Sequence, residues 1–140
     1  MEKTTMSVSV KTAEKPNYES EIIQIIKENV SPKAMLYQLE NYHGSDIADV
    51  MEQLNEQERR KLFRIYPADM LAEAFSHLEE ERAGEYLNEI PLKKVTAILE
   101  ELETDAAVEI LRTIGKEKRK LIIDALEEDI KKRNSTDRFF

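Results

Sequence analysis

A hydrophobic repeat with a period of twelve residues runs through most of the chain and limits its fold more than any other feature. From residue 54 to residue 126, every twelfth residue is apolar or aromatic, and so are the residues four and three positions before it. The repeating positions are Leu54, Tyr66, Leu78, Ile90, Leu102, Ile114 and Leu126, preceded by the pairs Val50/Met51, Leu62/Phe63, Ala74/Phe75, Tyr86/Leu87, Ile98/Leu99, Ile110/Leu111 and Ile122/Ile123. Seven consecutive units that follow one rule predict a stack of similar structural units.

Within each unit the apolar residues are spaced i, i+1, i+4, which is typical of the buried stripe of a short amphipathic helix. A unit leaves room for roughly nine helical residues, a length of about 14 Å. Such a helix is marginal alone and must bury its stripe against neighbouring helices. The sequence therefore predicts an all-α fold, a solenoid of about nine short helices in which each helix contacts only near neighbours.

The residues between the units show a second rhythm. Pro67, Pro91 and Gly115 follow one another at intervals of 24 residues. Proline ends one helix and suits the first turn of the next, so the structural unit is predicted to be a pair of helices. Asn55 and Glu58 have the spacing of a capping box at the start of a helix.

Single polar residues predict further helix starts. Ser45 and Thr104 are expected to cap helices that begin at the residue after each of them, and Asn17 is expected to cap the first helix. Ser31, followed by a proline, begins a helix that is expected to end at Gly44. The two helices before the repeat are predicted to cover one end of the stack.

These signals divide the chain into three parts. Residues 1–17 are polar and mixed in charge, and we expect them to form a disordered arm. Residues 18–133 are predicted to be the helical-repeat domain, and residues 134–140 a flexible tail. The last helix, within the stretch KEKRKLIIDALEEDIKKR, is expected to be longer and more charged than the others, as suits the end of a stack.

The charge of the chain argues against nucleic acid as a partner. The net charge is -8, and residues 45–115 alone contain seventeen acidic and eight basic residues. Such a body repels phosphate backbones. Residues 116–140 contain six acidic and eight basic residues, and we expect the basic clusters to be solvated helix ends. The sequence has no run of about 18 apolar residues that could span a membrane.

The sequence also argues against an enzyme. It contains no cysteine, phosphate-binding glycine loop, nucleophile elbow or H-E-x-x-H motif. We expect His43 to be a surface or capping residue at a helix end and His77 to have a half-buried structural role. Tyr66 and Tyr86 belong to the repeat and are expected to be core residues that keep their hydroxyl groups at the surface.

The remaining candidates for function are carboxylates. Asp105 and Glu109 are spaced i, i+4, so both side chains can face the same point beside one helix. Glu100, Glu101 and Glu103 crowd the preceding turn. A hard divalent cation prefers oxygen ligands, and Mg²⁺ often takes only one or two carboxylates and several waters. Spacing alone leaves two alternatives, a solvated acidic face or a divalent cation site.

Residues 45–130 resemble the cytosolic N-terminal domain of the MgtE family of magnesium transporters. The stretches that carry the resemblance are SDIADVMEQL, PADMLAEAFSHLEEERAGEYLNEIP and LKKVTAILEELETDAAVEILRTI. The resemblance implies a right-handed superhelix that lies in the cytoplasm, at the cytosolic face of the membrane. It also implies a regulatory role: Mg²⁺ neutralises the repulsion between acidic faces of this domain and CBS domains, which favours the closed channel.

By local motif match, the resemblance places Mg²⁺ ligands at Glu73, Asp105 and Glu109. Binding of Mg²⁺ is expected to be weak and shared with a partner domain. The implied partners are the CBS domains and the transmembrane domain of the same transporter, with a possible homodimer of the full-length protein. The short-helix repeats of this chain also resemble those of flagellar motor switch modules, which connect proteins. The alternative function is therefore a stand-alone, metal-independent adaptor between proteins.

Overall fold

The computed structural model describes residues 18–138, with side chains up to Arg133, and this range contains nine helices and no strand. The helices are α2 (Tyr18–Lys27), α3 (Pro32–Leu39), α4 (Gly44–Met51), α5 (Glu56–Ile65), α6 (Ala68–Phe75), α7 (Glu80–Leu87), α8 (Leu92–Glu101), α9 (Thr104–Arg112) and α10 (Lys116–Arg138). The all-α prediction is confirmed. No helix of the described range is both long and apolar enough to cross a bilayer.

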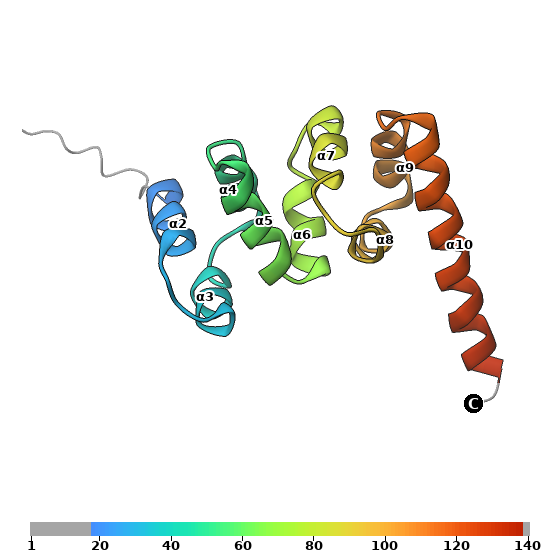
Figure 1. Cartoon of the computed structure of the whole chain (residues 1–140), viewed down its shortest axis with the longest axis horizontal. Helices are drawn as coiled ribbons and strands as arrows, with labels where there is room; N and C mark the ends of the chain where they lie inside the picture. Colours follow the sequence, from blue (N-terminus) through green and yellow to red (C-terminus); the bar gives the residue numbers. More distant parts are fainter. Residues whose placement is uncertain (1–17, 139–140) are drawn as a thin grey trace, which may run out of the picture.

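The helices pack alternately, so that a helix contacts the second helix after it in the chain. One row runs α2, α4, α6, α8, α10, and in the other row α3 packs on α5 and α7 on α9. Figure 1 shows the resulting elongated arrangement, with α2 at one end and α10 at the other. Packing between alternate helices is what a unit of two helices and 24 residues requires. The right-handed sense of the superhelix stays a prediction.

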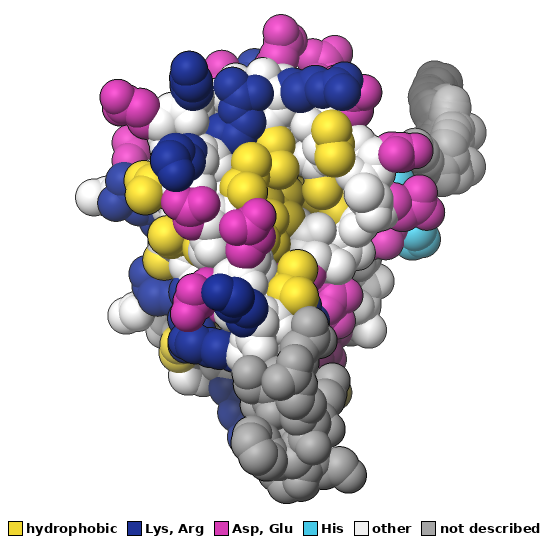
Figure 2. Space-filling model, turned by 90° about the vertical axis from the view of Figure 1, so that its right-hand side faces the viewer, with side chains coloured by type: hydrophobic (Ala, Val, Ile, Leu, Met, Phe, Trp, Pro, Cys, Tyr) yellow, Lys and Arg dark blue, Asp and Glu magenta, His cyan; other side chains and the backbone are white. Residues whose placement is uncertain are grey.

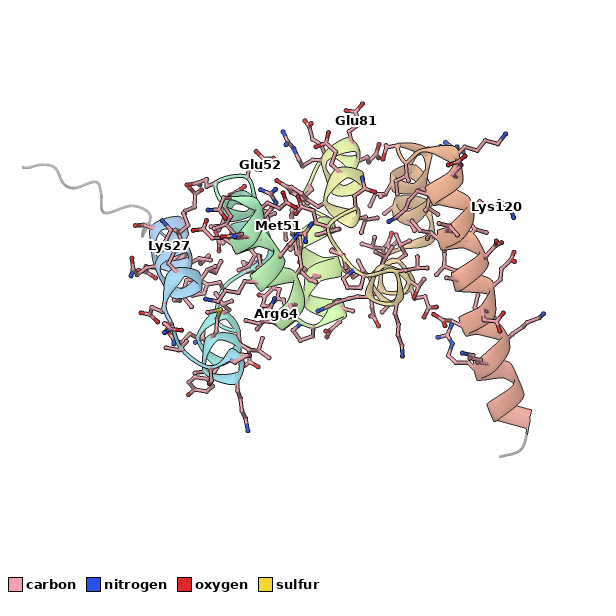
Figure 3. All side chains as sticks on the ribbon, in the orientation of Figure 1. Lys27, Met51, Glu52, Arg64, Glu81 and Lys120 are labelled. Atoms are coloured by element: carbon pink, nitrogen blue, oxygen red, sulfur yellow. The ribbon has the colours of Figure 1, made fainter. Side chains whose placement is uncertain are left out.

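The repeat positions form most of the core. Every first member of the seven pairs is buried, and so are four of the seven anchors: Leu54, Tyr66, Ile90 and Ile114. The other anchors and one pair member are only half-buried against the core: Leu78, Leu102, Leu111 and Leu126. Figure 3 shows the contrast between Met51, which points inward, and Glu52 and Glu81, which point away from the stack. The prediction of Ile123 as a core residue is wrong, because 39% of it is exposed.

The predicted helix starts are confirmed where a side chain closes a hydrogen bond. The Asn55–Glu58 capping box is present, and Ser31 Oγ accepts a hydrogen bond from the Ala34 amide. Helix α4 begins at Gly44 and α9 at Thr104, each earlier than expected, so neither Ser45 nor Thr104 is an N-cap. The N-cap residues are instead His43 and Glu103, which have extended backbones and make no capping hydrogen bond with their side chains.

Basic side chains tie neighbouring helix ends together. Lys61 Nζ donates to the backbone oxygens of Ile26 at 2.8 Å and Glu28 at 3.0 Å, at the end of α2. Lys94 Nζ donates to the Phe63 oxygen at 2.5 Å, at the end of α5. Burial lowers the pKa of Lys94. These lysines satisfy carbonyl groups that a helix leaves unpaired in its last turn.

The ends of the described range bear on the predicted boundaries. Helix α10 ends at Arg138, and the domain boundaries at residues 18–133 and 134–140 stay predictions. The expected arm of residues 1–17, with the Asn17 cap, lies outside the described residues, so it stays a prediction. The expectation for Tyr66 is wrong: the residue is only 2% exposed, and burial raises its pKa to about 12.

Candidate functional site

An acidic cleft lies between α6 and the turn that joins α8 to α9. Its volume is about 460 Å³. It is lined by Asp69, Ala72, Glu73, Ser76, Glu101, Leu102, Glu103 and Ala106. Half of these residues carry a carboxylate, and among the described residues no basic side chain lines the cleft. The arrangement places four carboxylates around one concave part of the surface.

Glu73 reaches this cleft because of its position on α6. The neighbouring Ala74 and Phe75 are buried in the core, which turns Glu73 outward and leaves 58% of its side chain exposed. Its Oε2 atom lies 3.3 Å from Nε2 of His77, one helical turn later. His77 is itself exposed, so its expected half-buried role is wrong.

Gly44 allows α4 to approach the backbone of Glu73 closely. A Cβ atom at position 44 would lie 2.5 Å from Cγ of Glu73 and 3.1 Å from its carbonyl carbon. The sequence prediction treated Gly44 as a helix stop, whereas the residue is a buried packing contact at the start of α4. The absence of a side chain at position 44 thus helps to place Glu73.

Asp105 and Glu109 lie on α9, one turn apart and exposed, as their spacing predicts. Asp105 is in the first turn, where the partial positive charge of the helix end favours a carboxylate. Oε2 of Glu109 lies 3.4 Å from Nη1 of Arg112, an exposed ion pair that is worth little in water. Neither Asp105 nor Glu109 lines the cleft, although the cleft borders the first turn of α9.

The three predicted ligands therefore do not converge on one point. Within the described residues, no three or more His, Asp or Glu side chains are grouped so that they could hold a metal ion. A hydrated Mg²⁺ needs fewer protein ligands than that, since waters can complete its octahedral shell. What the arrangement offers is a set of exposed carboxylates that can attract cations and can share one with a facing surface.

The sequence prediction missed Asp69 as a residue of the cleft. Asp69 and Glu73 are spaced i, i+4 on α6, the same spacing that drew attention to Asp105 and Glu109. That signal was available. The approach of Glu101 and Glu103 to Glu73 was not, because it depends on how α8 packs against α6.

The geometry can be compared with known proteins. A family model described as the MgtE intracellular N domain matches residues 42–136, which is more than half of the chain. Among curated proteins, none matches the chain significantly.

Two solved structures are similar, each with a TM-score of 0.67. One is the cytosolic domain of the Mg²⁺ channel MgtE in complex with ATP; it is 27% identical, and the match covers 76% of this chain and 44% of that chain. The other is the soluble part of a magnesium transporter; it is 20% identical, and the match covers 76% and 42% of the two chains. At that lower identity the likeness shows the fold alone. The chain spans less than half the length of either structure.

Proposed function

The chain belongs to the family of MgtE intracellular N domains, and we propose that it is the Mg²⁺-sensing regulatory domain of a magnesium transporter. The resemblance expected from residues 45–130 is confirmed, and the family's description as intracellular agrees with the predicted cytosolic location. In the proposal, exposed carboxylates of this chain and of CBS domains repel one another when Mg²⁺ is scarce. When Mg²⁺ is abundant, it bridges the two surfaces and favours the closed channel.

The acidic cleft is the observation that supports this proposal most directly. Its four carboxylates have no basic side chain among the described lining residues, so the charge there is not neutralised at close range by the cleft itself. Glu73 lies in the cleft, and Asp105 lies in the helical turn that borders it. One solved relative is described as part of a Mg²⁺ channel and the other as part of a magnesium transporter.

The physical basis is differential binding. A cation held between two acidic surfaces gains ligands from both, whereas a cation at one surface gains ligands from one and keeps more water. Mg²⁺ therefore binds the associated state more tightly and shifts the population toward it. With one surface alone, binding is expected to be weak. In the proposal, Glu73, Asp105 and Glu109 each contribute carboxylate oxygens to cations that are shared with the facing surface, rather than to one common site.

The test is a Mg²⁺ titration of the isotope-labelled chain, followed by backbone NMR, with K⁺ at matched ionic strength as the control. We expect saturable shifts that centre on Glu73, Asp105 and Glu109 with Mg²⁺ alone. The variant Asp105→Asn should fold normally, because the side chain is exposed, and should bind Mg²⁺ about tenfold more weakly, since it loses a charged oxygen ligand. Asp49→Asn, an exposed aspartate on α4, is the matched control and should leave binding unchanged.

Small uniform shifts shared by Mg²⁺ and K⁺ would instead indicate only a screened acidic surface. Titration of the chain with a CBS-domain pair then decides between the two functions. Association that requires Mg²⁺ supports the regulatory domain. Association that is independent of divalent cations and weakens with salt supports the metal-independent adaptor.

A further inference from the structure

The exposed fraction of the second residue in each hydrophobic pair differs between the last helix of a row and the helices before it. In the row of α4, α6 and α8 this residue is fully covered, with exposed fractions of 0% for Met51, 1% for Phe75 and 4% for Leu99. In α10, the last helix of the row, Ile123 is 39% exposed, although the first member of its pair, Ile122, is fully buried. In α10 the first residue of the pair is therefore as buried as in the preceding helices, and the second residue is not.

In the other row, too, the second residue of the last hydrophobic pair is more exposed than its equivalents in the preceding helices. Phe63 of α5 and Leu87 of α7 are buried, whereas Leu111 of α9 is only half-buried. Ile110, the first member of the α9 pair, is 3% exposed. The described range contains no helix that packs on α9 or α10 as α9 packs on α7 and α10 on α8. The missing contact is therefore the one that a further helix of the repeat would make.

Neighbouring side chains extend this uncovered side. Val108 lies three residues before Leu111 on α9, and Ile130 lies seven residues after Ile123 on α10, so each shares a helix face with its partner. Both are large exposed apolar residues. We define the terminal face as Val108, Leu111, Ile123, Leu126 and Ile130. Figure 2 looks onto this end of the molecule and shows hydrophobic side chains gathered at its centre.

Basic residues border the terminal face. Arg112 ends α9, and Lys116, Arg119 and Lys120 occupy the first turns of α10. Figure 2 shows Lys and Arg side chains along the upper edge of the hydrophobic patch, and Asp and Glu side chains beside its lower edge. Residues 116–133 contain seven basic and five acidic residues, a net charge of +2 in a chain whose net charge is -8. Lys120 pairs with Asp124 and Arg112 with Glu109, and Glu127 shares the face of α10 with Ile123 and Ile130. The net positive charge of this end still favours carboxylates near the α9–α10 turn, and it opposes a second copy, which would bring like charges together.

We propose that the terminal face is a docking surface for an acidic amphipathic helix of a partner protein. The partner helix continues the stack and covers the side of α9 and α10 that a further repeat would cover. Its apolar side chains pack on Ile123 and Ile130, and its carboxylates face the bases at the α9–α10 turn. This docking involves no Mg²⁺ and does not depend on the proposed regulatory function.

A peptide from the chain itself provides the probe. Residues 67–79, PADMLAEAFSHLE, contain the apolar spacing of the repeat, three acidic residues and no Lys or Arg. A hydrocarbon staple between two positions of the polar side that carry no acidic residue holds the peptide helical, because so short a helix is marginal in water. The binding partner is the full chain, isotope-labelled for NMR, in EDTA so that divalent cations play no part.

We expect saturable shifts centred on Leu111, Ile123 and Ile130. The variant Ile123→Ser/Ile130→Ser should raise the Kd about tenfold, since two apolar anchors are lost. Lys116→Glu should also weaken binding, as should a peptide with Lys at its three acidic positions. Leu121→Ser is the matched control: Leu121 is 57% exposed on α10 but is not part of the terminal face, so its loss should leave the Kd unchanged.

Three results would overturn the proposal. The first is the lack of saturable shifts at the terminal face with up to about 1 mM peptide. The second is equal binding of the acidic and the basic peptide. The third is self-association of the chain, measured by sedimentation and abolished by Ile123→Ser/Ile130→Ser, because a second copy would then be the occupant. Use of EDTA keeps these outcomes separate from any failure of Mg²⁺ sensing.

Discussion

At the scale of single residues, two glycines set how closely neighbouring helices can approach each other. Gly44 admits Glu73 of α6, and Gly84 admits Thr113 at the end of α9. A Cβ atom at position 84 would lie 2.3 Å from Oγ1 of Thr113, a hydroxyl that also donates to the Ile110 oxygen at 2.7 Å. Thr113 is β-branched, which restricts its rotamers, and its hydroxyl is hydrogen-bonded to Ile110. Its side chain therefore cannot move aside without losing that hydrogen bond.

Gly84→Ala should therefore destabilise the fold by about 1–3 kcal/mol, the usual cost of overpacking. The better helix propensity of alanine offsets only part of this cost. Gly115→Ala is the control, because nothing lies within 4 Å of a Cβ atom there. It should change the free energy of unfolding by less than about 0.5 kcal/mol. Urea melts of both variants measure the difference, and equal midpoints would contradict the close contact at Gly84.

At the scale of helices, the sequence predicts the elements well and their exact ends less well. The pairs at i, i+1 depend only on helical periodicity, so buried positions such as Phe63 and Leu87 could be predicted from spacing. The burial of the anchors could not be predicted in the same way: Leu102 and Tyr66 both follow the last turn of a helix, yet Leu102 is half-buried and Tyr66 is buried, because their exposure depends on tertiary packing. The acidic cleft shows the same limit: its carboxylates meet through the packing of α6 and α8, which spacing does not contain.

One ion pair between elements offers a test of how α5 is held to the turn after α7. Arg59 donates from Nε and Nη2 to the two carboxylate oxygens of Glu89, at 2.9 and 2.8 Å. Its Nη1 donates to the Leu54 oxygen, and its guanidinium lies 5.0 Å from the centre of the Tyr86 ring. The Glu89 hydrogen bond is the main cause that raises the pKa of Arg59.

Arg59→Lys keeps the charge but loses the two-pronged geometry, so it should destabilise the fold by about 1–2 kcal/mol. The neighbouring Arg60→Lys is the matched control. Arg60 pairs with Glu56 at 2.7 Å, but more than half of each side chain is exposed, and such pairs contribute little. Thermal melts compare the two variants. If both melt like the parent chain, the Arg59 contacts do not help to hold α5 in place.

At the scale of the whole molecule, the stack is a strongly acidic body with one basic end, and its charge shapes its response to pH. Because the net charge is already -8 at pH 7, each further negative charge on the folded chain is disfavoured by repulsion. Tyr66, between α5 and α6, is the clearest case. Burial is the main cause that raises its pKa to about 12, and the nearby Glu40 adds to the effect.

The sign of the pH effect follows from linkage. The pKa of Tyr66 is higher in the folded state than the value of about 10 expected in the unfolded chain, so folding favours the protonated phenol. The stabilisation that Tyr66 contributes is fully present below about pH 10 and is lost as the pH rises toward 12, a total of about 3 kcal/mol.

Tyr66→Phe cannot ionise and should lose less stability over this range than the parent chain. Tyr37→Phe, at a site 75% exposed, is the control and should follow the parent chain. Urea melts between about pH 9 and pH 12 measure the free energy of unfolding of all three. Parallel curves for Tyr66→Phe and the parent chain would mean that Tyr66 ionises in the folded state as freely as in water, and that the core at the α5–α6 junction is open to solvent.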